Sequence, residues 1–336
     1  MSEPAASVIF ALSESRELAA DIARVASLKL QPLEERAFEE GEFKLRPLVP
    51  VRDQTVFAVQ SLAGSSDAPV AQRLVRLLFL LFGLHDAGAA RTIAVVPYLS
   101  FARKDRRTQT RDPVNTRYVA QLLESTGLAR LIALDVHNPA ALDNAFRIPV
   151  DHLSALPMFV NHFAERFPGG KLVVASPDVG GIKRVQIFRD LLARCLGEDT
   201  EVVFIEKRRV GGVVSGGAIV GNVVGRTVIV LDDLCATGGT LTRAAAGLRE
   251  AGAAAVHVAV THAPLAAGLT TLSAADSIAG IVVTDSVGTA LHVGNSARQP
   301  KLTVLPIAPL IGQAVRRIAD SASLAPLLDR WPPADL

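Results

Sequence analysis

The stretch VIVLDDLCATGGT, residues 228–240, carries the strongest indications of fold and function in the chain. Its four leading apolar residues, three of them β-branched, predict a buried strand. Asp232 and Asp233 follow at the carboxyl end of that strand, and small residues then lead into an alanine-rich segment that predicts a helix from about Leu241. A strand, a loop and a helix in this order are typical of a parallel α/β sheet, which binds its ligands at the carboxyl ends of its strands.

The chemistry of this loop favours a sugar phosphate. A glycine-rich turn into a helix offers backbone N–H groups and a positive dipole end to a phosphate, and Gly238 and Gly239 allow a close approach. The neighbouring acids suit ribose hydroxyls or a divalent cation. The predicted site residues are therefore Asp232, Asp233, Ala236, Thr237, Gly238, Gly239 and Thr240. The alternative is an ordinary strand-to-helix turn that happens to carry two acids.

Length and composition indicate a globular protein of two domains. The chain has 336 residues, 49% of them apolar and 20% charged, with a formal net charge of +2. Such a small net charge argues against broad nucleic-acid binding. Cys195 and Cys235 lack metal-site spacing, which favours a reducing compartment. With no signal-peptide pattern and no apolar run long enough for a bilayer, we expect a cytoplasmic protein without membrane contacts.

Strand and helix patterns alternate along the chain, which predicts parallel sheets with helical crossovers. Strands are expected at residues 56–59, 92–96, 131–134, 172–174, 202–205, 228–231, 256–260 and 281–283. Helices are expected at residues 15–26, 70–84, 116–125, 156–167, 184–196, 241–251 and 310–319. The helix over Leu74–Leu84 is apolar nearly all round, which predicts burial in a core or a subunit interface. A domain boundary is expected between Pro149 and Pro157.

Four further segments carry candidate chemistry. Residues 103–117 hold six basic side chains after a strand, which suits a polyphosphate, although a solvated charged loop is the alternative. His137 and Asp178 follow two other strands and could bind a divalent cation. Lys207 and Arg209 precede two glycine pairs, so they could close over a reaction centre and neutralise a phosphoryl transition state. The alternative for this last segment is a surface hairpin.

The ordered set of motifs from about Phe38 to Ser286 resembles the ribose-phosphate diphosphokinases, or PRPP synthases. The segments that carry the resemblance are FEEGE 38–42, FARKDRR 101–107, ALDVHNP 133–139, IPVDHL 148–153, SPDVGG 176–181, EKRR 206–209, DDLCATGGT 232–240 and THAPL 261–265. The resemblance implies an α/β fold of two similar phosphoribosyltransferase-like domains, each a mostly parallel sheet flanked by helices. These would span residues 1–153 and 154–305, with a C-terminal helix and tail, 306–336, packed on the first.

The resemblance also implies a reaction and its site. The diphosphoryl group of ATP would pass to O1 of ribose 5-phosphate, which gives PRPP and AMP. Lys207 and Arg209 would be catalytic, His137 and Asp178 would hold Mg²⁺, and the loop at 232–240 would hold ribose 5-phosphate. The residues implied for ATP are Phe38, Glu40, Glu42, Arg103, Lys104 and Asp105. The expected assembly is a homo-oligomer built from dimers, such as a hexamer.

Some positions depart from the commonest family pattern. Ala236 stands where an Asp is usual, Glu40 replaces an Asp, and Lys104 replaces a Gln. Gln109 replaces a basic residue, and the tail lacks the usual aromatic ending, so phosphate activation and allosteric ADP inhibition are not implied. Two alternatives stay open: a phosphoribosyltransferase that consumes PRPP, and a catalytically silent relative that assembles with an active enzyme.

Overall fold

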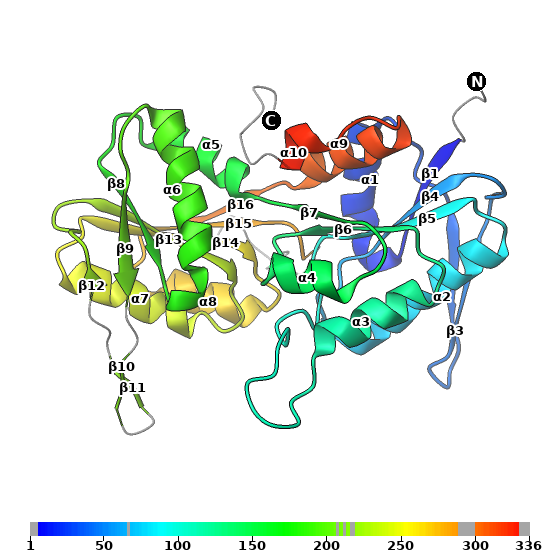
Figure 1. The fold of residues 1–336 in the computed structure, drawn as a ribbon, viewed down its shortest axis with the longest axis horizontal. Coiled ribbons are helices and arrows are strands. Elements are labelled where there is room, and N and C mark those ends of the chain that lie inside the picture. The colour runs from blue at the N-terminus through cyan, green and yellow to red at the C-terminus, as the bar shows by residue number, and fades with distance from the viewer. Residues whose placement is uncertain are drawn as a thin grey trace. The chain divides into compact units, whose positions relative to one another are not determined.

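The computed structural model describes residues 6–65, 68–205, 208–210, 213–215, 219–287 and 300–328. The chain divides into two compact units. In the described part, unit 1 consists of residues up to Ser154 together with 286–287 and 306–328. Unit 2 consists of residues 155–285 and 300–305. Each unit has its own sheet and its own helices (Figure 1).

Unit 1 is built on a parallel five-stranded sheet with the order β1-β4-β5-β6-β7. Its strands are β1 Ser7–Ala11, β4 Thr55–Val59, β5 Arg91–Val96, β6 Arg130–Leu134 and β7 Val150–Leu153. A separate antiparallel hairpin is formed by β2 Leu33–Ala37 and β3 Phe43–Pro47. The continuous apolar runs of β4, β5 and β6 are buried, as expected for strands that are covered on both faces.

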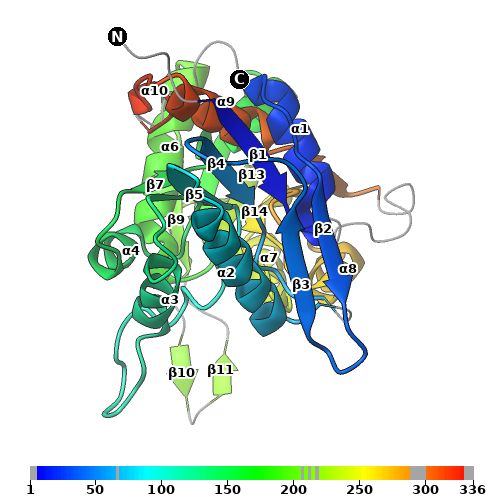
Figure 2. The ribbon, with the colours of Figure 1, turned by 90° about the vertical axis from the view of Figure 1, so that its right-hand side faces the viewer.

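Helices cover both faces of this sheet (Figure 2). They are α1 Arg16–Ala26, which follows the short turn η1 Ser13–Ser15, and α2 Val70–Asp86, α3 Asn115–Glu124, α4 Pro139–Ala145, α9 Ala308–Ala319 and α10 Ala325–Leu328. α1 and α9 lie on one face, and α2, α3 and α4 lie on the other (Figures 1 and 2). α9 packs closely on α1 because Gly312 has no side chain: a Cβ there would lie 2.5 Å from that of Val25.

Unit 2 is built on a seven-stranded sheet with the order β12-β9-β8-β13-β14-β15-β16, parallel except for the edge strand β12. The strands are β8 Leu172–Ser176, β9 Glu201–Ile205, β12 Ile219–Val220, β13 Thr227–Leu234, β14 Ala255–His262, β15 Gly280–Thr284 and β16 Leu302–Leu305. The helices are α5 Leu156–Arg166, α6 Ile182–Leu196, α7 Gly239–Glu250 and α8 Ala266–Ala274, with a short turn η2 Val179–Gly181. β10 Arg208–Val210 and β11 Val213–Ser215 form a separate antiparallel hairpin.

The two sheets confirm the predicted α/β fold and share one order of strands. β1-β4-β5-β6-β7 in unit 1 matches β8-β13-β14-β15-β16 in unit 2, and each series is parallel throughout. The pairing register also agrees, because Thr55 pairs with Arg91 at the start of β4 as Thr227 pairs with Ala255 at the start of β13. The loops that follow β4 and β13 therefore take equivalent places in the two units.

Structure and expectation differ in a few elements. All eight expected strands and all seven expected helices are present, but the sequence patterns missed β1, β7, β12, β16, the β2–β3 hairpin, α4, α8 and α10. One side of α2 is buried in the core of unit 1, and for the other side burial in a subunit interface stays a prediction. Within this chain Val75, Phe79 and Phe82 are 40%, 55% and 39% exposed. Among the described residues, no helix is both long enough and apolar enough to cross a membrane.

Candidate functional site

The acid pair of unit 2 lies inside β13 rather than after it. Asp232 pairs with Val260 of β14, and the strand continues to Leu234, which pairs with His262. The backbone N–H of Asp233 donates to Oδ1 of Asp232 at 2.9 Å. The two carboxylates are therefore held next to each other at the carboxyl end of the sheet, where an open parallel sheet binds its ligands.

Arg184 joins this pair and was missed from the sequence. It lies in the first turn of α6, and its Nη1 lies 3.1 Å from Oδ1 of Asp233 and 3.5 Å from Oδ1 of Asp232. The side chain of Arg184 is 17% exposed, that of Asp233 8% and that of Asp232 22%. An arginine between two acids in a poorly solvated place is an electrostatic unit, because removing the cation would leave like charges side by side.

Burial and charge determine how Asp232 ionises. Burial, followed by the negative charge of Asp233, raises the pKa of Asp232 to about 8, although Arg184 acts in the opposite direction. Asp232 therefore holds a proton near neutral pH more readily than an ordinary aspartate does. A hydroxyl or a cation that approached this carboxylate would favour its ionised form.

The loop after β13 turns tightly into α7. Gly238 has a φ of +78° and is the residue that precedes α7, and Thr242 N donates to its carbonyl at 2.9 Å. A Cβ at Gly238 would lie 2.8 Å from the carbonyl oxygen of Gly268, at the start of α8. Both the positive φ and this close approach require glycine. The loop consequently presents backbone at a helix N-terminus, which is the arrangement that binds phosphate groups. Cys235 is buried beneath it, and both cysteines are free thiols.

The SPDVGG segment follows the neighbouring strand β8. Oδ1 of Asp178 accepts the backbone N–H of Gly180 at 3.0 Å and so caps the turn η2. A Cβ at Gly181 would lie 2.5 Å from Oγ of Ser176, so this glycine is needed for a compact turn. Because β8 pairs with β13 in parallel, the turn lies at the same edge of the sheet as the acid pair.

In unit 1 the charged loop after β5 is organised around Asp112. Its carboxylate accepts the backbone N–H groups of Thr108 and Gln109 at 2.9 and 3.0 Å, as well as the Thr108 hydroxyl at 2.7 Å. Lys104 forms an ion pair with the same carboxylate. The Lys104 contact and the hydrogen bonds from Thr108 hold the pKa of Asp112 well below its usual range. The basic cluster is thus a folded loop, and Arg103 on it is exposed.

The neighbouring strand end in unit 1 adds Asp105, Asp135 and His137. Nδ2 of Asn138 donates to Oδ2 of Asp105 at 2.5 Å, which links the basic loop to the start of α4. Asp135 has a φ of +36° and accepts the Ser154 hydroxyl at 2.9 Å. His137 is exposed two residues later. The structure therefore brings the predicted residues of the basic loop and the DVHNP segment to one edge of the unit 1 sheet.

FEEGE is the turn of the β2–β3 hairpin. The backbone N–H of Phe38 donates to the carbonyl of Glu42 at 2.8 Å, and Gly41 has a φ of +92°. Glu40 and Glu42 are exposed, and the guanidinium of Arg36 lies 4.9 Å from the centre of the Phe38 ring. This hairpin belongs to its own two-stranded sheet.

Two predicted residues receive little or no description. Lys207 lies outside the described residues, and Arg209 is described only as backbone, where it pairs with Val214 in the β10–β11 hairpin. Within the described residues, no group of three or more His, Cys, Asp or Glu side chains forms a metal cluster. His137 and Asp178 belong to different units.

Comparisons with known proteins identify the family. A model of the N-terminal domain of ribose phosphate pyrophosphokinase matches residues 7–127, and one of the phosphoribosyl synthetase-associated domain matches residues 214–329. A ribose-phosphate pyrophosphokinase of Listeria ivanovii is 36% identical over 322 residues, which cover 96% of both chains. The chain belongs to the ribose-phosphate pyrophosphokinase family. A second family member, from Granulibacter bethesdensis, is also 36% identical and covers 96% of this chain and 99% of its own.

A solved structure supports the same assignment. The phosphoribosylpyrophosphate synthetase of Mycobacterium smegmatis matches with a TM-score of 0.83 and 30% identity. The match covers 94% of this chain and all of that one. The chain is therefore an enzyme of the ribose-phosphate pyrophosphokinase family, and its α/β architecture is shared with a solved member.

Proposed function

We propose that this enzyme transfers the diphosphoryl group of MgATP to O1 of ribose 5-phosphate, which yields PRPP and AMP. The observation that carries the proposal is the end of β13, where an arginine-supported acid pair precedes a glycine turn into α7. In the reaction, O1 of the sugar bonds to the β-phosphorus and loses its proton. The bond from that phosphorus to the bridging oxygen breaks, and AMP leaves with this oxygen.

The loop after β13 would hold the sugar. Backbone N–H groups from Ala236 to Thr240, at the start of α7, bind the 5-phosphate. Asp232 and Asp233 accept hydrogen bonds from the ribose hydroxyls, and Arg184 keeps both carboxylates in place. These residues do no covalent chemistry, because the contribution expected of a phosphoryl-transfer enzyme is positioning and charge stabilisation.

Residues of unit 1 would hold ATP. Arg103 and Lys104 contact the phosphates, and Asp105, which is tied to Asn138, fixes the start of the basic loop. Lys104 exchanges its ion pair with Asp112 for a phosphate when ATP binds. Phe38, Glu40 and Glu42 at the tip of the β2–β3 hairpin contact the adenosine. In a dimer-based homo-oligomer, this hairpin serves the ATP site of a neighbouring subunit.

Mg²⁺ fits the donor types present. His137 and Asp178 offer an imidazole and a carboxylate, and a magnesium ion typically uses one or two protein ligands with substrate phosphates and water. Burial, and after it the charge of Asp233, raises the pKa of Asp232, and a cation bound nearby would favour the ionised carboxylate. When bound, the ion neutralises phosphate charge and orients the phosphate chain. Lys207 and Arg209 add positive charge at the diphosphoryl group during transfer.

The test is a product analysis. The purified protein is mixed with ribose 5-phosphate, ATP and Mg²⁺, and the nucleotides are separated by chromatography. Equal amounts of AMP and PRPP are expected, and Lys207→Ala is expected to lower this rate with little change in ribose 5-phosphate affinity. ADP in place of AMP would contradict the proposal. No turnover at all would favour the catalytically silent relative, and consumption of PRPP with a free base would favour the phosphoribosyltransferase.

A further inference from the structure

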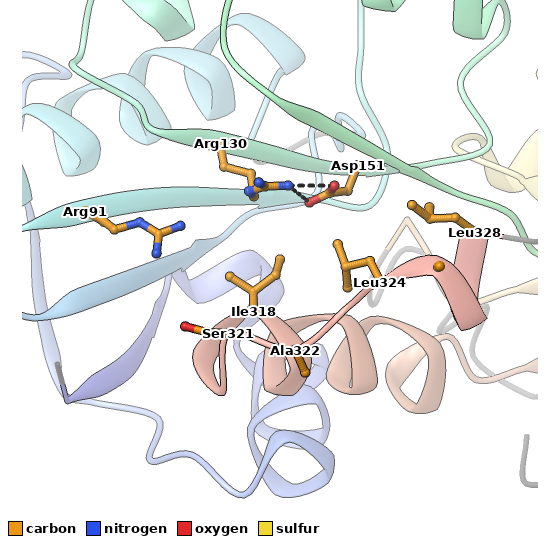
Figure 3. A pocket seen from close by; sticks show the side chains of 9 residues that line it. Arg91, Arg130, Asp151, Ile318, Ser321, Ala322, Leu324 and Leu328 are labelled. Atoms are coloured by element: carbon orange, nitrogen blue, oxygen red, sulfur yellow. Dashed lines mark hydrogen bonds and ion pairs between the residues drawn. The ribbon is translucent and has the colours of Figure 1, made fainter. Parts of the chain in front are cut away.

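A pocket of about 510 Å³ lies in unit 1 at the edge of the sheet where the strands begin (Figure 3). Arg91 and Arg130 are the first residues of β5 and β6, and Asp151 belongs to β7. The C-terminal segment forms the rest of the lining, with Ile318, Ser321, Ala322, Leu324, Ala325 and Leu328. The basic loop and the DVHNP segment follow the opposite, carboxyl ends of these strands, so the pocket is separate from them.

The pocket carries an excess of positive charge. Nη1 of Arg130 lies 2.7 Å from both carboxylate oxygens of Asp151. The Nε of Arg130 is buried and has no hydrogen-bond partner in the described part of the chain. Arg91 is exposed, and among the described residues no ion pair or hydrogen bond engages its side chain. Two guanidinium groups and one carboxylate thus line the pocket, and the donors of the exposed Arg91 side chain remain available to a ligand.

The opposite wall is apolar. Ile318 and Leu324 point from α9 and the turn after it toward the two arginines (Figure 3). The chain reverses at Ser321, which has a φ of +55°. The last carbonyls of α9 are occupied, because Ser321 N donates to Ile318 at 3.2 Å and Ala322 N donates to Arg317 at 2.6 Å. The helix end therefore adds few unpaired acceptors that would repel an anion.

We propose that this pocket binds an organic phosphate. The phosphate lies between Arg91 and Arg130, because guanidinium groups pair with phosphate oxygens through two parallel hydrogen bonds. The apolar body of the molecule packs on Ile318 and Leu324. The volume is in the usual range for small-molecule sites. A bound molecule would tie the C-terminal segment to the strand starts and raise the stability of unit 1. This site is additional to the proposed reaction and does not depend on it.

Phenyl phosphate tests the proposal, because it joins a phosphate to an apolar ring. Its binding is measured by calorimetry with ribose 5-phosphate present at saturation, and inorganic phosphate is titrated in parallel. The wild-type protein is expected to bind phenyl phosphate more tightly than inorganic phosphate. Arg91→Gln is expected to lower the affinity for phenyl phosphate roughly tenfold, the effect of losing one hydrogen bond to a charged group. Leu324→Asp is expected to weaken it as well.

Arg316→Gln is the matched control, since this exposed arginine lies on α9, pairs with Asp320 and is not part of the pocket lining. It should leave the affinity unchanged. Melting curves check that each variant is folded, and Arg91→Gln changes only an exposed side chain. Unchanged affinity in Arg91→Gln, or loss of phenyl phosphate binding when ribose 5-phosphate is added, would overturn the site. Equal affinities for inorganic phosphate and phenyl phosphate would overturn the proposal that the ligand is an organic phosphate.

Discussion

The loops after β4 and β13 take equivalent places in two sheets of the same strand order, but they differ in chemistry. Counted from Thr55 and Thr227, which begin the two strands, Gln60 stands where unit 2 has Asp232, and Ser61 stands where it has Asp233. Gln60 is fully buried, and both atoms of its amide lack hydrogen-bond partners among the described residues. The described part of the unit 1 loop has no carboxylate.

The arginines that lie beside the two loops, Arg73 on α2 and Arg184 on α6, also act differently. In unit 1, Arg73 donates to the carbonyls of Ala68 and Ser61 at 3.3 and 3.5 Å, and to the Ser65 hydroxyl at 3.2 Å. It thereby closes the loop on itself. In unit 2, Arg184 instead supports two acids that face the loop. One backbone arrangement therefore forms a structural loop in unit 1 and the proposed ligand site in unit 2, and a few side chains make the difference.

The largest effect is expected from Asp232→Asn. The amide keeps the size of the side chain but removes its charge and one acceptor, so kcat/KM for ribose 5-phosphate should fall roughly 10²- to 10³-fold, as for a lost charge-stabilising group. Steady-state kinetics measure this change in kcat/KM. Gln60→Met, at the equivalent place in unit 1, should leave kcat/KM unchanged. If Gln60→Met lost activity and Asp232→Asn kept it, the loop of unit 1 and not that of unit 2 would be the ligand site.

A second prediction concerns the stability of unit 2 at low pH. His257 on β14 is buried against Phe163 and Phe167. Burial, then the charges of Arg166 and His162, lowers its pKa from 6.5 to about 4. The unfolded chain therefore binds the extra proton first. The stability contributed by the neutral ring is complete above about pH 6.5 and falls by about 3 kcal/mol toward pH 4.

Urea unfolding of wild type and His257→Gln between pH 8 and pH 4 measures this contribution. At pH 8 the ring is neutral in both states, so the difference between the proteins there gives the packing loss alone. As the pH falls, the wild type should lose stability more steeply than the variant. Parallel curves for the two proteins would show that another group causes the acid sensitivity.

Arg184→Gln should have a smaller effect on catalysis than Asp232→Asn. Without the cation, the pKa of Asp232 rises further, so the acid limb of the pH–rate profile should move to higher pH. At neutral pH, kcat/KM should fall roughly tenfold, the value of about one pKa unit of lost interaction. Arg184→Lys should restore part of the rate, and Arg194→Gln, an exposed arginine on the same helix, should change nothing. If the rate fell but the pH profile did not shift, Arg184 would act through packing and not through the ionisation of Asp232.

The smallest effect is expected from Gln60→Met on stability. An unpartnered buried amide costs free energy, and an apolar side chain of similar size removes that cost, so unfolding should require roughly 1 kcal/mol more. Gln60→Glu should have the opposite sign because it buries a charge. Thermal and urea unfolding measure both variants. Destabilisation by Gln60→Met would contradict this prediction and would mean that the side-chain amide of Gln60 stabilises the fold.

The elements that were predicted correctly are those with a strong local pattern. β4, β5, β6 and β13 are continuous runs of buried apolar residues, and such runs are recognisable without knowledge of their neighbours. β7, β16 and the β2–β3 hairpin were missed because they are short, partly exposed or rich in charged residues. They become strands through pairing with a partner, and a local pattern does not report that pairing.

The sequence by itself determined the fold class, the family and the chemical types at the strand ends, because acids, glycines and arginines retain their chemistry wherever the chain takes them. Only the tertiary structure decided which of them act together. Arg184 reaches Asp233 across 49 residues because β8 and β13 pair in parallel. Likewise, Arg91 and Arg130 share a pocket with Leu324 because the C-terminal segment packs beside the strand starts. Such contacts depend on long-range pairing and packing, which no local window of residues contains.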